Sequence, residues 1–166
     1  MLADNDKGGF IFYTNYGSRK GQELEANPKA ALVFYWEPIK RSVRVEGNVE
    51  RVSVDQSEAY FHSRPIGSQI GAAVSEQSKV IADRSVLEDK GRQLQEEYGA
   101  VSGKTLSKPE SWGGYRVIPK SVEFWQGQST RIHDRIRFRL IDPSDNPDPT
   151  LFIQGDNGWI IERLSP

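Results

Sequence analysis

The segment Ser121–Arg139 contains two runs in which apolar and polar residues alternate, separated by Gly127–Thr130. Alternation with a period of two is typical of strands, and a short glycine-containing segment between two such runs is typical of a hairpin. We therefore predict two antiparallel strands joined by a turn at Gly127–Thr130. The same segment brings Trp125, several arginines and His133 close together, a mixture that suits flat aromatic or anionic ligands. A solvated hairpin with a ladder of ion pairs would give the same pattern, so this segment leaves both interpretations open.

The rest of the chain alternates irregularly between predicted strands and predicted helices. Further strands are expected at Phe10–Thr14, at Ala31–Trp36 (buried on both faces), at Arg41–Val54 (with a bulge or bend at Gly47), at Trp112–Ile118 and at Trp159–Leu164. Helices are expected from a Ser18 cap to Asn27, from a capping box at Ser53 to a stop near Pro65, and over Ser85–Tyr98 with a capping box at Ser85. Turns or loops are expected at Arg64–Ser68, Ser75–Ser78, Lys104–Ser111 and Asp142–Thr150. Because no regular βαβ repeat appears, the prediction is an α+β domain, mainly β, built on an antiparallel barrel or sheet.

The beginning of the sequence is unusual for such a fold. Asp4–Gly9 has the composition of a tight turn, and a strand follows it, but only Met1, Leu2 and Ala3 come before it. A hairpin turn needs a strand on each side. We therefore expect the first strand to be missing or shortened, which would leave an unpaired sheet edge.

Composition narrows the classes of function. A chain of 166 residues fits one domain, 1–166, and its net charge of −1 gives no general attraction to nucleic acid or membranes. There is no cysteine, no apolar run long enough to span a bilayer and no visible signal peptide, and we expect a cytoplasmic protein. Glycine-rich nucleotide motifs, the nucleophile elbow of hydrolases and metal-binding spacings are absent, and two histidines are few for a zinc site.

Two clusters could bind phosphate groups. Arg19 and Lys20 lie in the first turn of a predicted helix, where cations oppose the helix dipole unless an anion binds there. Tyr60, Arg64 and Ser68 are spaced four residues apart, so a continuous helix would put them on one face, although Pro65 makes that continuity doubtful. Solvated side chains and a polar helix rim are the plainer interpretations of these two clusters.

Eight sequence blocks together resemble the pyridoxine/pyridoxamine 5′-phosphate oxidase family. In chain order they cover nearly the whole sequence: Phe12–Lys20, Tyr60–Pro65, Ser68–Gly71, Gln77–Ser78, Ser111–Gly114, Glu123–Gly127, Arg131–Arg135 and Glu162–Pro166. The resemblance implies an FMN-binding split β-barrel with peripheral helices that works as a homodimer, with each flavin at the subunit interface. It implies oxidation of pyridoxamine or pyridoxine 5′-phosphate to pyridoxal 5′-phosphate, with O2 reduced to hydrogen peroxide.

The resemblance also implies a role for individual residues. Contacts to FMN would come from Tyr13, Thr14, Arg19, Lys20, Gln77, Ser78, Trp125 and Arg135, with Gln77 and Ser78 reaching over from the partner subunit. The substrate phosphate would bind Tyr60, Arg64 and Ser68, and its pyridine ring would lie beneath Arg131 and His133. Because a guanidinium stays charged, Arg131 would position the ring and stabilise charge rather than act as a base, with His133 as a hydrogen-bonding orienter.

Two departures from the family pattern leave an alternative open. Ala3 stands about where the family has Lys, and Ser42 where it usually has Gln. With the first strand shortened as well, the chain could instead be a non-catalytic flavin- or pyridoxal phosphate-binding relative. A flavin reductase on the same barrel is a third interpretation, although such an enzyme does not need the Tyr60, Arg64 and Ser68 set.

Overall fold

The computed structural model describes residues 2–6, 8–99, 102–142 and 144–166. The chain divides into two compact units, one of residues 1–28 and 50–116, the other of residues 29–49 and 117–166. Two long strands, β4 (Arg41–Arg51) and β5 (Trp112–Gln126), contribute residues to both units. We call them unit 1 and unit 2 and describe each by itself.

Unit 1 begins with an antiparallel hairpin of β1 (Leu2–Asp6) and β2 (Gly9–Asn15). Asp6 lies opposite Gly9, and Gly8 between the strands has a positive φ of 89°; Lys7 lies outside the described residues. The predicted turn at Asp4–Gly9 is therefore wrong in its bounds, whereas the predicted shortening of the first strand is confirmed. Residues 4–6 pair with β2 despite their turn-forming side chains, because ladder pairing overrides local propensity. The first strand is short, but it is present.

The described residues of unit 1 also form the helices α1 (Arg19–Ala26), α2 (Val54–Ser63), α3 (Ile66–Val74) and α4 (Ser85–Tyr98). The predicted caps of α1 and α2 are confirmed, since Ser18 Oγ accepts from Gly21 N–H at 3.1 Å and Ser53 Oγ accepts from Gln56 N–H at 3.1 Å. The capping box at Ser85 is wrong, because Ser85 is already helical and its own N–H donates to Asp83 Oδ1. The predicted turn at Arg64–Ser68 is shorter than expected, since α3 begins at Ile66.

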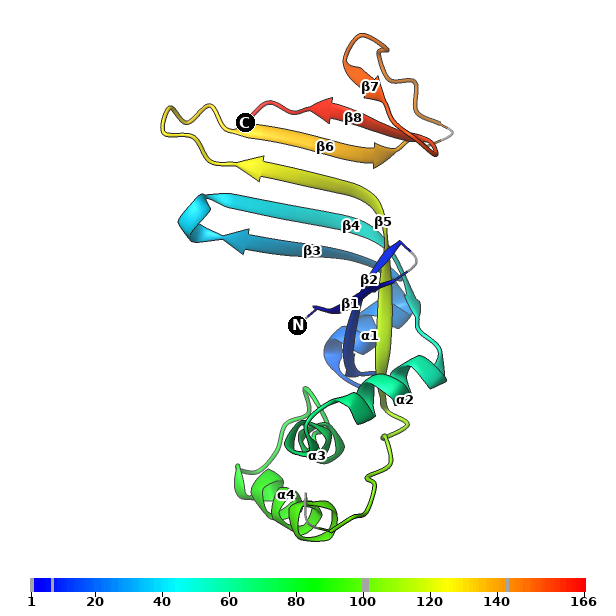
Figure 1. The fold of residues 1–166 in the computed structure, drawn as a ribbon, viewed down its shortest axis with the longest axis vertical. Coiled ribbons are helices and arrows are strands. Elements are labelled where there is room, and N and C mark those ends of the chain that lie inside the picture. Colours follow the sequence, from blue (N-terminus) through cyan, green and yellow to red (C-terminus); the bar gives the residue numbers. More distant parts are fainter. Residues whose placement is uncertain (1, 7, 100–101, 143) are drawn as a thin grey trace. The chain divides into compact units, whose positions relative to one another are not determined.

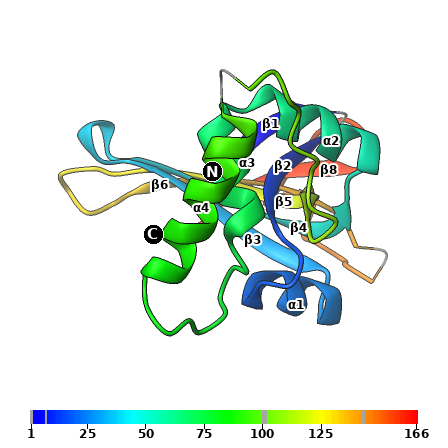
Figure 2. The same ribbon diagram turned by 90° about the horizontal axis from the view of Figure 1, so that it is seen from below.

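The core of unit 1 lies between these helices and β5. Its buried members are Phe61, Ile70, Leu106 and Trp112, and α4 packs Leu94 and Tyr98 against them. Helices α3 and α4 lie side by side (Figure 2), as the predicted apolar stripe on Ser85–Tyr98 requires. No described helix is long and apolar enough to cross a membrane.

Unit 2 is an antiparallel sheet. Its strands pair in the order β3 (Lys29–Trp36), β4, β5, β6 (Asp134–Leu140), β8 (Trp159–Arg163) and β7 (Phe152–Gln154), which can be followed in Figure 1. A short 3-10 helix, Glu37–Ile39, joins β3 to β4. The predicted last strand is confirmed, whereas β7 was not predicted; it follows the predicted loop Asp142–Thr150, in which Pro143 lies outside the described residues.

Three details of unit 2 differ from prediction. β3 is not buried on both faces: it pairs only with β4, and Val33 and Tyr35 are 65% and 57% exposed. Gly47 makes no bulge against β3, where the register is continuous; its Cβ would instead lie 2.0 Å from the carbonyl oxygen of Ile118 on β5. The connection between β5 and β6 runs over residues 127–133, longer than the predicted turn at Gly127–Thr130, so Arg131 and His133 stand outside the strands.

Candidate functional site

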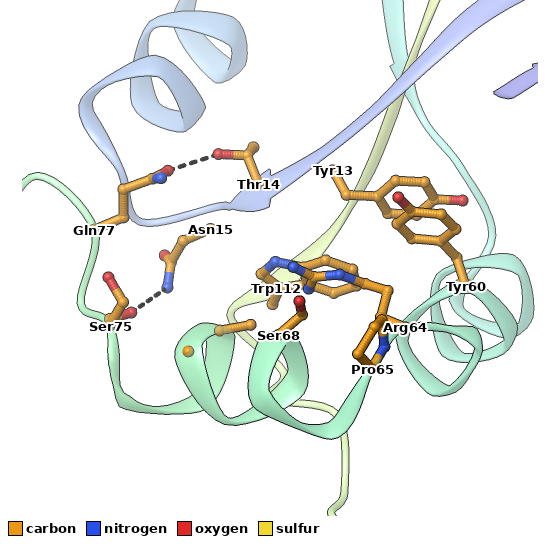
Figure 3. Close-up of a pocket in the computed structure, with 12 residues that line it drawn as sticks. Tyr13, Thr14, Asn15, Tyr60, Arg64, Pro65, Ser68, Ser75, Gln77 and Trp112 are labelled. Atoms are coloured by element: carbon orange, nitrogen blue, oxygen red, sulfur yellow. Dashed lines mark hydrogen bonds between the residues drawn. The ribbon is translucent and has the colours of Figure 1, made fainter. Parts of the chain in front are cut away.

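Unit 1 contains a cavity of about 540 Å³ that gathers six of the predicted site residues (Figure 3). The residues that line it are Tyr13, Thr14, Asn15, Tyr60, Arg64, Pro65, Ser68, Gly71, Ala72, Ser75, Gln77 and Trp112. They come from β2, from the α2–α3 region, from the loop after α3 and from the start of β5. The cavity therefore combines hydroxyl groups, two amides, a cation and three aromatic rings.

The α2–α3 junction explains how Tyr60, Arg64 and Ser68 come together. α2 ends at Ser63, Arg64 is its extended C-cap residue, and Pro65 precedes the first turn of α3. The continuous helix is therefore broken at Pro65, as its missing N–H and fixed φ favour. All three side chains nevertheless line the same cavity. The backbone at the break is held by Gln69 Nε2, which donates to the Arg64 carbonyl at 2.8 Å.

Arg64 is the cation of this cavity. Its guanidinium lies over the Trp112 ring, with Cζ 5.2 Å from the ring centroid. Its Nη1 is buried without a hydrogen-bond partner, and no described carboxylate forms an ion pair with it. A buried donor on a charged group is costly to leave unpaired. An anion bound in the cavity would supply the acceptor that Arg64 Nη1 lacks.

Three aromatic side chains form a wall beside Arg64. The rings of Tyr13 and Tyr60 stack with centroids 3.9 Å apart and 13° between their planes. Trp112 lies nearly parallel to Tyr13 at 5.3 Å. Figure 3 shows the two tyrosine rings stacked beside Arg64 and Trp112. Parallel rings of this kind give a planar ligand an apolar surface to contact.

A second cation stands at the Thr14 side of the cavity. Lys20 Nζ, in the first turn of α1, donates to Thr14 Oγ1 at 2.6 Å and lies 3.4 Å from Gln77 Oε1. Thr14 Oγ1 in turn donates to Gln77 Oε1 at 2.7 Å. Burial lowers the pKa of Lys20, and no carboxylate among the described residues pairs with it. Its partners are neutral, so its positive charge is available to an anion.

Three predicted residues of unit 1 do not line this cavity: Lys20, which contacts its lining residue Thr14, and Arg19 and Ser78. Arg19 is 85% exposed and forms an ion pair with Glu23, four residues along α1. Ser78 follows Gln77 in a left-handed conformation with φ 72° and is exposed. The interaction of Gln77 is with Thr14 of its own chain, whereas the resemblance implies contact with the flavin of a partner subunit.

Unit 2 contains a separate cavity of about 460 Å³. The predicted residues Trp125, His133 and Arg135 line it together with Val33, Tyr35, Ser42, Arg44, Glu123 and Pro166. Ser42, noted in the sequence for its difference from the family, is thus a neighbour of predicted flavin contacts. Arg131 is exposed in the β5–β6 connection, with φ 64° and its N–H donating to the Gln128 carbonyl, and does not line this cavity.

The polar groups of this second cavity are held in place. The N–H of Gln128 donates to His133 Nδ1 at 3.1 Å, which requires that ring nitrogen to be unprotonated. The His133 ring also contacts Trp125, with centroids 5.1 Å apart. Arg135 is bound by Glu123 and by the Ser165 carbonyl at 2.9 Å. The Arg135 guanidinium keeps the pKa of Glu123 below its usual value.

Sequence reasoning assigned no role to Trp112, Gly71 or Glu123. Trp112 and Glu123 lie inside the resembling blocks Ser111–Gly114 and Glu123–Gly127, but nothing local distinguishes them from core or surface residues. Their contacts to Arg64 and Arg135 come from other strands and helices. Only the folded chain reveals those pairs.

Comparisons with known proteins agree on one family. Residues 1–98 match a family model described as pyridoxamine 5′-phosphate oxidase, and residues 112–166 match one described as the pyridoxine 5′-phosphate oxidase C-terminal dimerisation region. A pyridoxine/pyridoxamine 5′-phosphate oxidase of Bombyx mori is 52% identical over 160 residues, which are 96% of this chain and 62% of that protein. The pyridoxine-5′-phosphate oxidase of Bos taurus is 50% identical over 167 residues, covering all of this chain and 63% of that protein. This chain thus spans somewhat less than two thirds of both relatives.

Solved structures agree on the fold. PhzG from Burkholderia lata, in complex with tetrahydrophenazine-1-carboxylic acid, superposes with a TM-score of 0.83 at 25% identity, covering 99% of this chain and 72% of that one. A pyridoxamine 5′-phosphate oxidase-related, FMN-binding protein from Nostoc punctiforme superposes with a TM-score of 0.69 at 12% identity, covering all of this chain and 77% of that one. At that identity the likeness concerns the fold alone.

Proposed function

Because this chain belongs to the pyridoxamine 5′-phosphate oxidase family, we propose that it oxidises pyridoxamine or pyridoxine 5′-phosphate to pyridoxal 5′-phosphate. Two electrons and two protons leave the C4′ position and reduce O2 to hydrogen peroxide; the amine substrate also takes up water and releases ammonia. The observation that carries the proposal is the buried, unpartnered Nη1 of Arg64 beside Tyr60 and Ser68. A substrate phosphate would supply the missing acceptor with charge-assisted hydrogen bonds.

The residues of unit 1 also suit FMN. A nucleotide phosphate needs a cation without a carboxylate partner, and Lys20 meets that requirement beside Thr14 and Gln77. Two phosphorylated ligands need two separate cations. Arg64 lines the cavity, and Lys20 donates a hydrogen bond to Thr14, which also lines it. Bound FMN would supply the two-electron chemistry that no protein side chain here provides. Arg19, Ser78, Trp125 and Arg135 stay proposed flavin contacts on the strength of the family resemblance.

The chain's own residues would bind and orient the substrate. Arg64, Tyr60 and Ser68 would hold the phosphate, and the aromatic wall would restrict the orientation of the ring. Arg131 and His133 would act on the pyridine ring, Arg131 as a permanent cation and His133 as an orienter. The hydrogen bond from Gln128 N–H to His133 Nδ1 would leave Nε2–H as the donor toward the substrate.

We also propose a homodimer. The exposed apolar residues Val33, Tyr35 and Trp36 on β3 are the kind of surface that a second subunit covers. The family model matched by residues 112–166 is described as a dimerisation region. The single domain 1–166 and a cytoplasmic location are retained as proposals.

The main argument for a non-catalytic binding protein is weakened. It depended on a missing or shortened first strand, and β1, although short, pairs with β2 over Leu2–Asp6. A flavin reductase would not need a phosphate-binding site at Arg64. The relatives at about 50% identity carry the name of the oxidase.

Absorption and peroxide release test the proposal. Purified protein, supplied with FMN, is expected to be yellow and to release one hydrogen peroxide for each pyridoxal 5′-phosphate formed from pyridoxamine 5′-phosphate. Unphosphorylated pyridoxamine is the matched control, because it lacks the group that Arg64 would bind. Protein that takes up FMN yet forms neither product would contradict the oxidase function.

A further inference from the structure

One wall of the unit 1 cavity is a single face of α3. Ser68, Gly71 and Ala72 line the cavity at spacings of three and four residues, which a helix places on one side, and Ser75 lines it just after α3 ends at Val74. Gly71 lies in the interior of this helix. A glycine in a helix interior destabilises the helix by roughly 1 kcal/mol relative to alanine. Its presence therefore calls for a reason.

The fold itself gives no reason. A Cβ added at Gly71 would meet no heavy atom within 4 Å, and the residue is not among those with positive φ. Gly113 differs, since a Cβ there would lie 1.9 Å from the hydroxyl oxygen of Tyr16. Alanine would therefore fit at Gly71 without touching the protein. The open space beside Gly71 adjoins the cavity.

We infer that Gly71 is a specificity-determining residue, whose missing side chain leaves room for the ring of the phosphorylated substrate against α3. This inference rests on the proposed function. With the phosphate held at Arg64 and Ser68, the ring would lie in the part of the cavity that Gly71 borders. Gly71 stands one turn after Ser68, about 4.5 Å farther along the helix axis. A methyl group at Gly71 would occupy the space that the ring needs.

The test compares Gly71→Ala with Gly91→Ala in the FMN-loaded protein. Gly91 lies in the interior of α4, also has open space around a Cβ, and is not among the residues that line the cavity. Replacing either glycine is expected to raise the unfolding midpoint by roughly 2–4 °C. Only Gly71→Ala is expected to weaken binding of pyridoxal 5′-phosphate, by about tenfold or more, because overpacking a tight site is costly.

Inorganic phosphate tests the phosphate site alone, because it carries no ring. Its inhibition constant is expected to stay within about twofold of wild type in Gly71→Ala, because Arg64 and Ser68 are unchanged. Equal affinity of wild type and Gly71→Ala for pyridoxal 5′-phosphate would overturn the inference while leaving the oxidase function intact. So would a lower unfolding midpoint for Gly71→Ala, which would mean that the fold itself requires the glycine. Failure of the wild-type protein to bind pyridoxal 5′-phosphate would instead overturn the proposed function.

Discussion

The Arg135 side chain on β6 forms a two-point ion pair with Glu123 on β5, with Nε to Oε1 at 2.7 Å and Nη2 to Oε2 at 3.1 Å. The two residues are diagonal neighbours across the strands, since Arg135 lies opposite Trp125 and Glu123 opposite Arg137. The pair is partly buried, with the Glu123 side chain 12% exposed. Glu123 therefore fixes the orientation of a guanidinium that we assign to FMN.

Replacing Glu123 by Gln should weaken FMN binding. Gln keeps one acceptor oxygen but loses the charge and the second acceptor, so the two-point ion pair would be lost. We therefore expect about fivefold weaker FMN binding and about 1 kcal/mol lower stability. Flavin fluorescence titration and urea unfolding measure the two effects. Glu88→Gln, which breaks the exposed pair with Arg84, is the control and should change neither. Unchanged FMN affinity in Glu123→Gln would show that Arg135 needs no such support.

Arg64→Met should separate substrate binding from folding. Losing a charge-assisted contact to phosphate should raise KM for pyridoxamine 5′-phosphate by roughly 10- to 100-fold. The stability of the unliganded protein should change little, because Nη1 has no hydrogen bond to lose and the Met side chain can replace the contact with Trp112. Steady-state kinetics and thermal unfolding would report both. Arg92→Met, on the exposed face of α4, is the matched control, and an unaltered KM in Arg64→Met would contradict the assigned phosphate site.

Lys20→Met should weaken FMN binding without lowering the stability of the protein that lacks FMN. Burial lowers the pKa of Lys20, which means that the fold disfavours its charged form when no anion is bound. We therefore expect FMN to bind roughly tenfold or more weakly, while the free energy of unfolding without FMN stays the same or rises. Lys90→Met on α4 removes an exposed charge for comparison. If Lys20→Met bound FMN as tightly as wild type, Lys20 would not be the phosphate ligand.

Tyr115 gives a test at alkaline pH. Burial, together with its hydrogen bond to Glu25 at 3.0 Å, raises the pKa of Tyr115 to about 12 from an ordinary 10. The folded protein thus holds the phenol proton of Tyr115 more tightly than the unfolded chain does, which stabilises the fold. This stabilisation is complete below pH 10 and is lost as pH rises from about 10 to 12. Tyr115→Phe should cost about 1 kcal/mol at pH 8, and its deficit should shrink as pH passes 10. Urea unfolding of both proteins at several pH values measures this; a constant deficit would be inconsistent with the raised pKa.

Gly47→Ala should destabilise unit 2. The added Cβ would lie 2.0 Å from the carbonyl oxygen of Ile118, and a backbone group within β5 cannot easily move aside. We expect a loss of about 2–3 kcal/mol, measured by urea unfolding. Gly91→Ala, which meets no neighbour, should be neutral or stabilising. Equal stability of Gly47→Ala and wild type would mean that β4 and β5 can separate at this point without cost.

Signals confined to a few neighbouring residues were predicted well. Ser18 and Ser53 each accept a hydrogen bond from the N–H three residues later, and that geometry depends only on local sequence. The bounds of α4 were also predicted correctly, because its apolar stripe and flanking polar residues lie within a single helix. Such interactions do not depend on how distant segments pair.

Features set by distant partners were not predicted. Residues 4–6 of β1 have turn-forming side chains and become a strand only because β2 lies beside them. β3 has the composition of a buried strand, yet it pairs on one side only and exposes Val33 and Tyr35. The family resemblance identified residues that line two cavities, but it could not indicate that Trp112 lies beside Arg64 or that Glu123 holds Arg135.

The discontinuous make-up of unit 1 has a consequence for synthesis on the ribosome. Residues 1–28 are completed early, but they bond to β5 and its preceding residue, as in the 2.6 Å hydrogen bond from Tyr16 N–H to the Ser111 carbonyl. At about 5–20 residues per second, the nascent β2 strand waits roughly 5–20 s for that partner to emerge. During that interval Ile11, fully buried in the finished protein, has no β5 to cover it. Translation speed between residues 28 and 116 is therefore expected to influence how much of this chain reaches its native state.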